Sequence, residues 1–166
     1  PSMSRPRRRA LVTGAGVRIG RAIAIELAAH GFEVAVHYHQ SAESAEAVAT
    51  ECRAVGGEAW TIDAELATLE GCQSLVAAVS TRWNELHVLV NNASTFEPVP
   101  FEELTTSSWE QMLAVNLRAP MLLSQGLLPL LRNSRAEELG GPADQGGLVA
   151  AAQRPHAIVR LAVAVK

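Results

Sequence analysis

The sequence is short of cysteine, of aromatic residues and of long apolar runs. Its two cysteines, Cys52 and Cys72, lie far apart in segments of helical pattern, which is more typical of reduced, buried thiols than of a disulfide framework. No apolar run reaches the roughly 18 residues that span a bilayer, and the first residues lack the apolar stretch of a secretion signal. We therefore expect a cytoplasmic protein that does not engage a membrane.

Charge of either sign is also sparse. Charged residues make up 19% of the 166 residues and the formal net charge is −3, so the overall charge does not favour nucleic acid as a partner. The arginines at 5 and 7–9 could form a nucleic-acid arm, but they are more typical of a solvated lead-in to a first strand. A chain of this length with 48% hydrophobic residues can bury one core. We expect a single domain over residues 1–166 that binds a small molecule.

Segments with strand patterns alternate along the chain with segments of helical period. The expected strands are 10–12, 33–38, 58–63 and 87–92, and the expected helices are 19–29, 41–55, 69–83 and 105–131, the last with a kink at Pro120. Strands separated by helices pair in parallel through right-handed crossovers. The sequence therefore predicts an α/β fold with a doubly wound parallel sheet, whose ligands bind beyond the carboxyl ends of the strands.

A glycine-rich segment, Thr13-Gly14-Ala15-Gly16-Val17-Arg18-Ile19-Gly20, follows the first strand and opens the first helix. Glycines let the backbone turn tightly and approach a pyrophosphate. The free N–H groups and the positive dipole end of the helix attract the negative charge of that group. We interpret the segment as a phosphate-binding turn rather than as a merely structural one.

The spacing of this segment resembles the fingerprint of the short-chain dehydrogenase/reductase family, in which a glycine usually stands at the position of Arg18. An arginine there, followed by a hydrophobic residue and a glycine, resembles the pteridine reductase branch. Asn91-Asn92-Ala93-Ser94, at the end of the fourth strand, resembles the turn that passes the cofactor in this family. The resemblance covers residues 10 to about 132, with a divergent tail over 133–166. It implies a Rossmann-type fold that is incomplete at its C-terminal side, and NADP(H) as the cofactor.

The end of the second strand favours NADP over NAD. His37-Tyr38-His39-Gln40-Ser41 contains no Asp or Glu, whereas NAD-binding sheets carry an acidic residue there for the ribose 2′-hydroxyl. A 2′-phosphate would meet no repulsion and could bind His39, Ser41 and Arg18, although Gln40 replaces the arginine usual in pteridine reductases. The two histidines could instead be ordinary polar residues at a strand end. The full set of residues expected to bind the cofactor is Gly14, Arg18, Ile19, Gly20, His37, Tyr38, His39, Ser41, Asp63, Asn92, Ala93 and Ser94.

Three of the expected site residues have roles implied by the resemblance. Asp63 would bind the adenine amino group, or would simply cap the following helix. Phe96 would stack on a pterin ring in the substrate site, or would plug a loop against the core. Asn116 would face inward from the middle of its helix and hold a water molecule of the proton relay.

The catalytic Tyr-x-x-x-Lys pair of the family has no clear counterpart. The only tyrosine is Tyr38, in the second strand. Ala152-Gln153-Arg154-Pro155 resembles a segment that follows the fifth strand in bacterial pteridine reductases, which would put Lys166 at the catalytic lysine and Ala162 at the tyrosine. Candidates for a fifth strand are 148–152 and 157–165.

Two functions remain open from the sequence. The first is an NADPH-dependent reductase of a pterin, a folate or another carbonyl or imine compound, with acyl-carrier and sugar reductases of the same superfamily also possible. The second is a non-catalytic NADP(H)-binding fragment. We expect no metal site, and we expect a homo-oligomer where the full family fold is present.

Overall fold

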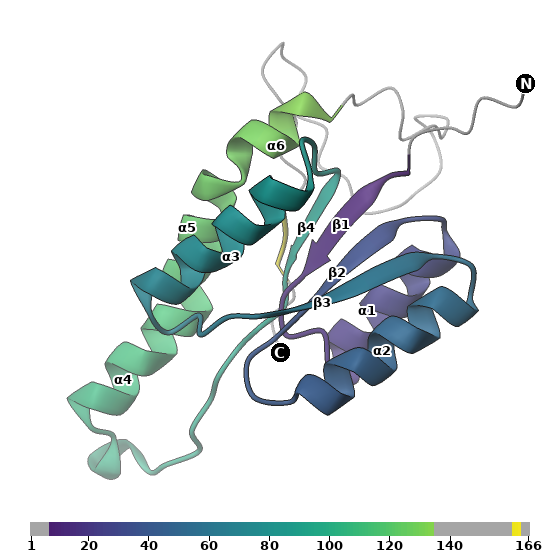
Figure 1. Ribbon diagram of the computed structural model, residues 1–166. Helices are drawn as coiled ribbons and strands as arrows, with labels where there is room; N and C mark the ends of the chain where they lie inside the picture. Colours follow the sequence, from purple (N-terminus) through teal and green to yellow (C-terminus); the bar gives the residue numbers. More distant parts are fainter. Residues whose placement is uncertain (1–6, 135–160, 164–166) are drawn as a thin grey trace, which may run out of the picture.

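The computed structural model describes residues 7–134 and 161–163 (Figure 1). Five parallel strands form one sheet in the order β3-β2-β1-β4-β5. The strands are β1 (Arg9–Val12), β2 (Glu33–Tyr38), β3 (Glu58–Asp63), β4 (Val88–Asn91) and β5 (Leu161–Val163). The chain proceeds outward from β1 to β3 and then returns to place β4 on the other side of β1. The doubly wound parallel sheet expected from the sequence is confirmed.

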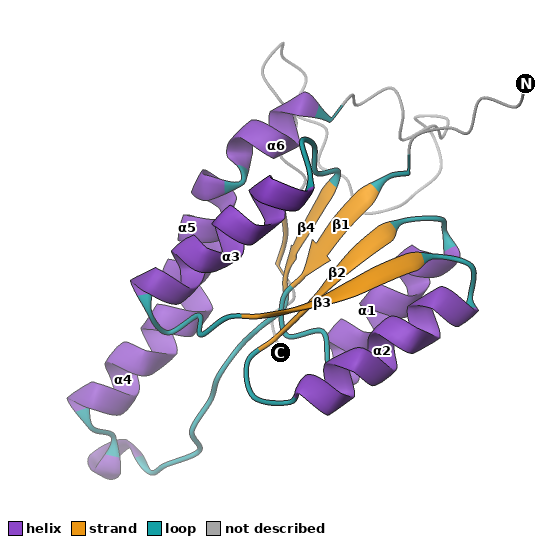
Figure 2. Ribbon diagram, in the orientation of Figure 1, coloured by secondary structure: helices purple, strands orange, loops and turns teal. Residues whose placement is uncertain are grey.

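Helices cover both faces of this sheet (Figure 2). The first face carries α1 (Arg18–Ala29) and α2 (Ala42–Ala54), and the second carries α3 (Leu69–Arg82) and α5 (Ala119–Gly126). The remaining helical segments are the 3₁₀ turn η1 (Phe101–Glu103), α4 (Thr106–Leu113), the π-helical turn η2 (Ala114–Arg118) and α6 (Leu128–Asn133). Among residues 7–134 no helix has the length and hydropathy needed to cross a bilayer.

The central strand β1 supplies side chains to two separate cores. Successive side chains of a strand point to opposite faces, so Leu11 packs with Leu75 and Leu123 under α3 and α5. Its neighbour Val12 packs with Val36 in the core under α1 and α2. All of these side chains are fully buried. This double burial fixes β1 rigidly and therefore also fixes the turn that follows it.

The long helix expected over residues 105–131 is divided into several pieces. Pro120 has no N–H to donate to the carbonyl of Asn116 four residues earlier. The turn just before it widens, and the N–H of Ala119 reaches back five residues to the carbonyl of Ala114. The expectation of one kinked helix is therefore corrected to α4, a π-helical turn, α5 and α6. Single π-turns of this kind are frequent at functional sites.

The fifth strand lies within the candidate segment 157–165. β5 pairs with β4 in parallel, and Ala162 lies opposite Val90. The expectation that Ala162 occupies the tyrosine position is wrong, because a Tyr-x-x-x-Lys pair brings two side chains onto one face of a helix and not onto a strand. Lys166, the candidate strand 148–152 and the segment 152–155 lie outside the described residues.

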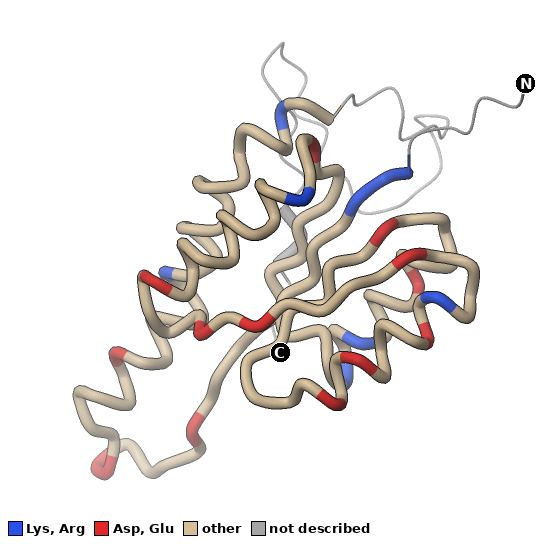
Figure 3. Tube along the Cα trace, viewed as in Figure 1, with Lys and Arg blue, Asp and Glu red and all other residues tan. Residues whose placement is uncertain are grey.

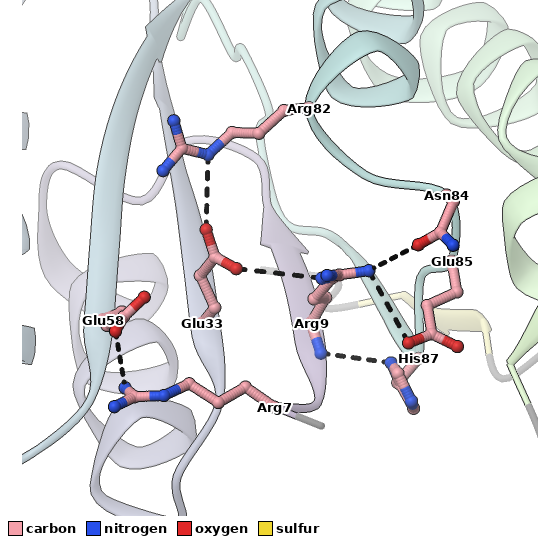
Figure 4. A network of polar contacts seen from close by, with 8 residues as sticks. All are labelled: Arg7, Arg9, Glu33, Glu58, Arg82, Asn84, Glu85 and His87. Carbon is pink, nitrogen blue, oxygen red and sulfur yellow. Dashed lines mark hydrogen bonds and ion pairs between the residues drawn. The ribbon is translucent and has the colours of Figure 1, made fainter. Parts of the chain in front are cut away.

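A network of charged groups ties the amino ends of the strands together (Figure 4). Glu33, at the start of β2, pairs with Arg9 of β1 at 3.8 Å and with Arg82 of α3 at 3.3 Å, and its side chain is only 12% exposed. Arg9 also pairs with Glu85 at 3.6 Å, and its backbone N–H donates to Nδ1 of His87 at 3.1 Å. The network thus lies at the edge of the sheet opposite to the one where ligands bind in such folds.

Glu33→Gln tests the contribution of this network to stability. The change keeps the shape of the side chain but leaves the guanidinium groups of Arg9 and Arg82 facing a neutral, half-satisfied partner. We expect the free energy of unfolding in urea to fall by about 1–3 kcal/mol. The matched control is Glu58→Gln, whose pair with Arg7 is exposed at 56% and 48% and should be worth under about 1 kcal/mol. Equal losses for the two variants would contradict a special role for Glu33.

Candidate functional site

A cavity of about 370 Å³ opens at the carboxyl ends of β1, β2, β3 and β4. This is the point in the sheet where the winding reverses, and it is where doubly wound sheets bind their ligands. The cavity is lined by the turn after β1, by the ends of β2 and β3, by the loop after β4 and by two side chains of α4 and η2. From these segments the lining residues are Gly14, Val17, Arg18, Ile19, Gly20, His37, His39, Gln40, Ala64, Glu65, Leu66, Asn92, Ala93, Ser94, Thr95, Gln111 and Val115.

Hydrogen bonds from the end of β4 hold the turn after β1. The hydroxyl of Thr13 accepts from the backbone N–H groups of Asn92 and Ala93, both at 3.0 Å. The side-chain amide of Asn92 donates to the carbonyls of Thr13 at 2.9 Å and of Gly14 at 3.0 Å. These carbonyls are therefore used inside the protein. Beyond Gly14, the N–H of Ala15 donates to the carbonyl of His37 at 2.9 Å, and the chain then enters α1, whose first residues Arg18, Ile19 and Gly20 line the cavity.

Two glycines are required by this packing, and a third is not. Gly14 has φ +61°, and a Cβ there would lie 2.9 Å from the Cα of Ala93. A Cβ on Gly20 would lie 2.3 Å from the carbonyl oxygen of Gly14 and 2.5 Å from Nδ2 of Asn92. A Cβ on Gly16 would meet nothing closer than 3.6 Å. The close approach of α1 to the turn is therefore possible only because residues 14 and 20 lack side chains.

The amino end of α1 has no side-chain cap. Its N-cap residue is Val17, which has no oxygen to accept from the first N–H groups, and its first turn contains no acidic residue. By contrast, α3 and α4 are capped by the hydroxyls of Thr68 and Thr105. Uncapped amide groups and the positive end of the helix dipole form a binding site for an anion.

Arg18 adds a positive charge to this helix end. It is the only non-glycine residue with positive φ, at +49°, within the described part of the chain. The left-handed conformation costs a residue with a Cβ about 1–2 kcal/mol, which explains why the resembling family usually has glycine at this position. Arg18 makes no ion pair within residues 7–134, whereas the next arginine, Arg21, is paired with Glu51 of α2.

His37 holds the turn and also lines the cavity. It is 2% exposed. Its Nδ1 accepts from the N–H of Gly14 at 3.0 Å, so its Nε2 carries the proton and donates to the carbonyl of Ala64 at 3.0 Å. Burial lowers the pKa of this imidazole below its ordinary value of 6.5. Both ring nitrogens bind the backbone, which gives His37 a positioning role toward the turn, and its expected contact with the cofactor stays a prediction.

His39 faces the cavity together with an acidic residue that the sequence analysis missed. Glu65 follows β3, and its Oε2 lies 2.6 Å from Nε2 of His39. Both residues line the cavity. The stretch 37–41 itself contains no Asp or Glu, but the fold places the carboxylate of Glu65 beside it. A signal was available, because β2 and β3 are adjacent parallel strands whose carboxyl ends lie side by side.

Five expected site residues that the structure describes do not line the cavity, and Asn116 is one of them. Tyr38 packs partly buried against the core under α1 and α2, and Asp63 is exposed at the end of β3. Ser41 is the N-cap residue of α2 but makes no cap hydrogen bond. Phe96 is 78% exposed on the loop after β4, so it does not plug that loop against the core, and its stacking on a substrate ring stays a prediction.

Asn116 is exposed in the π-helical turn and does not face inward as expected. Its side chain accepts from the N–H of Thr95 at 2.9 Å and donates to the carbonyl of Thr95 at 2.8 Å. These two bonds attach the loop after β4, which borders the cavity, to the widened turn of the helix. Within residues 7–134 no three acidic, histidine or cysteine side chains are arranged to bind a metal ion.

The turn, the uncapped helix and the switch point are features of a dinucleotide site, and comparison with known proteins agrees. A family model described as short chain dehydrogenase matches residues 8–139. The chain belongs to this family. The 3-oxoacyl-acyl-carrier-protein reductase of Staphylococcus aureus is 35% identical over 127 residues, which are 76% of this chain and 52% of that protein.

Solved structures of similar proteins give the same result. A short-chain dehydrogenase from Burkholderia cenocepacia J2315, in complex with NADP, is 40% identical with a TM-score of 0.69, over 73% of this chain and 49% of that one. The landomycin C-6 ketoreductase LanV, with bound NADP and rabelomycin, is 38% identical with a TM-score of 0.70, over 74% of this chain and 53% of that one. Both hold NADP, the cofactor expected from the sequence. The chain spans about half the length of these relatives.

Substituting alanine for single glycines tests the packing of the turn. Gly20→Ala forces a Cβ against the backbone of Gly14, and we expect it to lower the free energy of unfolding by about 2–4 kcal/mol. Gly16→Ala, in the same segment, should change that free energy by no more than about 0.5 kcal/mol. Urea titrations of the two variants make the comparison. If both were equally tolerated, the tight approach of α1 to the turn would be refuted.

The buried imidazole of His37 makes stability depend on pH. Because its pKa is lowered in the folded state, the unfolded chain takes up a proton first as the pH falls below 6.5. The contribution of His37 is complete above that pH and is lost as the pH falls toward the lowered value. His37→Gln keeps a donor and an acceptor without titrating, so its free energy of unfolding should fall less steeply than that of the wild type between pH 6.5 and more acidic conditions. Parallel profiles would contradict the assignment.

Proposed function

We propose that this chain binds NADP(H) as the cofactor-binding part of a short-chain reductase, folded as a single unit. The observation that carries the proposal is the amino end of α1. Its uncapped N–H groups and the unpaired charge of Arg18 lie on the wall of the cavity at the switch point of the sheet. This helix end can bind the negative charge of a diphosphate.

The residues present fit a dinucleotide. The absence of side chains at Gly14 and Gly20 lets the turn pack closely against Ala93 and the first turn of α1, and both glycines line the cavity. His37 and Asn92 hold the turn in place before any ligand arrives, so that little ordering is needed on binding. Bound NADPH supplies a hydride for reduction. The chain itself binds and orients that cofactor.

The relatives favour a ketone as the class of substrate. The Staphylococcus aureus protein reduces a 3-oxoacyl group and LanV is a ketoreductase, according to their names. We therefore propose reduction of a carbonyl compound. A pteridine reductase is the second candidate, and it is supported by Arg18 at a position with positive φ where glycine is usual. Phe96 gives it no support, since its ring lies away from the cavity.

The position of the single tyrosine bears on catalysis by this chain. Tyr38 lies in β2, partly buried against the core under α1 and α2, and the residue four positions later is Ala42, so Tyr38 does not form a Tyr-x-x-x-Lys pair. We propose that the 166-residue chain binds the cofactor without turning it over. Reductase activity requires the full fold of the family, and this chain forms the cofactor-binding part of that fold.

Arg18→Gly tests whether Arg18 contributes to NADPH binding without stabilising the fold. Fluorescence titration should show NADPH binding to the wild-type chain, and binding should weaken by about tenfold in the variant, which loses a charge-assisted contact to phosphate. The free energy of unfolding should stay constant or rise by up to about 1 kcal/mol, because glycine relieves the strain of positive φ. The control is Arg21→Gly, whose guanidinium is already paired with Glu51 and whose loss should leave binding within about twofold. Absence of NADPH binding to the wild-type chain would refute the proposed function, and steady NADPH oxidation would refute its non-catalytic part.

A further inference from the structure

The pair formed by His39 and Glu65 bridges two strand ends at the wall of the cavity. His39 follows β2 and Glu65 follows β3, and the two side chains are 44% and 40% exposed. An ion pair with this much exposure contributes little to stability. Its place on the cavity wall, beside the amino end of α1, therefore points to a role toward the ligand.

Glu65 is held firmly before any ligand arrives. Its Oε1 accepts from the backbone N–H of Ala67 at 2.9 Å, while Oε2 faces His39. Its carbonyl accepts from the hydroxyl of Thr68 at 3.0 Å. A Cβ on Gly71 would lie 1.9 Å from that carbonyl oxygen, so the first turn of α3 fits against the loop only with glycine there. The carboxylate thus has a fixed position and both of its oxygens are used.

The imidazole of His39 has one nitrogen left for a ligand. Nε2 is taken by Glu65, and Nδ1 makes no hydrogen bond to any other residue that the structure describes. The other charged or titratable groups near it are the neutral, buried His37 behind it, Asp63 at the end of β3 and Arg18 on the cavity wall. His39 therefore keeps a ring nitrogen for a ligand on the same cavity wall as the carboxylate with which it is paired.

We propose that Glu65 sets the choice between NADP(H) and NAD(H) by acting through His39, which masks its carboxylate. This inference rests on the proposed dinucleotide function. NAD-binding sheets place an acidic residue at the end of the second strand, where it accepts from the ribose 2′-hydroxyl and repels a 2′-phosphate. Here the acid follows the next strand, and its charge is paired with an imidazole on the cavity wall. The pair accepts a 2′-phosphate, and the bare carboxylate would reject it.

A double-mutant cycle tests the masking, with fragments of the two cofactors as probes. Adenosine 2′,5′-bisphosphate carries the 2′-phosphate and adenosine 5′-monophosphate lacks it. Calorimetric titration of the 166-residue chain gives the Kd of each probe for the wild type, His39→Gln, Glu65→Gln and the double variant. His30→Gln is the matched control, because His30 pairs with Glu26 at 3.5 Å on the exposed surface of α1. Circular dichroism checks that each variant is folded.

The masking predicts a rescue. His39→Gln should weaken binding of the bisphosphate by about tenfold, because it uncovers the carboxylate, and should change the Kd of the monophosphate by less than about twofold. The double variant should recover to within about threefold of the wild type, since a neutral glutamine has nothing to mask. His30→Gln should behave as the wild type with both probes.

Two results would overturn the inference while leaving the proposed function standing. In the first, the double variant binds the bisphosphate as weakly as His39→Gln, which would mean that His39 acts alone. In the second, His39→Gln binds both probes as the wild type does. A wild-type chain that binds neither probe would instead remove the proposed function, and this inference with it.

Discussion

The site depends on the hydrogen bonds from the side chain of Asn92 to the carbonyls of Thr13 and Gly14. They join the end of β4 to the end of β1, across the point where the sheet changes its direction of winding. They also decide which polar groups of the turn remain for a ligand, because the carbonyls are used inside the protein and the amide groups of α1 are not. The bond to Gly14 requires that Gly20 have no side chain, since a Cβ there would lie 2.5 Å from the donating nitrogen. A helix end that is open to an anion is thus a consequence of how two strands are joined.

Two histidines at the end of β2 have different functions in the same region. His37 lies within β2 and His39 follows the strand, and both residues line the cavity. The inner imidazole binds Gly14 and Ala64, and the outer one binds Glu65. Both reach from β2 toward the segment that follows β3. Two residues of one type thus have different roles because their burial differs: the inner ring is 2% exposed and structural, while the outer ring keeps a nitrogen for a ligand.

What could be predicted from the sequence depended on local signals. The sheet, the phosphate-binding turn and the segment around Asn92 could be predicted, because apolar period and glycine spacing are set by neighbours along the chain. The division of the helix over 105–131 was only partly predictable, since Pro120 indicates a break but not that the turn before it widens. The role of Glu65 was missed, because it arises from the pairing of β2 with β3, as were the exposure of Asn116 and Phe96. Glu65 lies far from His39 in the sequence and next to it in the fold.

The amino and carboxyl ends of the parallel strands differ in how their charges are paired. At the amino ends of the strands, Glu33 is nearly buried between Arg9 and Arg82, and Figure 3 shows acidic and basic positions gathered at the starts of β1, β2 and β3. At the carboxyl ends of the strands, the amino end of α1 has no side-chain cap. Arg18 has a strained backbone there and makes no ion pair among residues 7–134. Strain and unpaired polar groups lower stability, so they persist only where the surrounding structure holds them. The doubly buried strand β1 links the two ends. Its rigid packing allows the carboxyl end to keep a geometry that the local sequence alone would not favour.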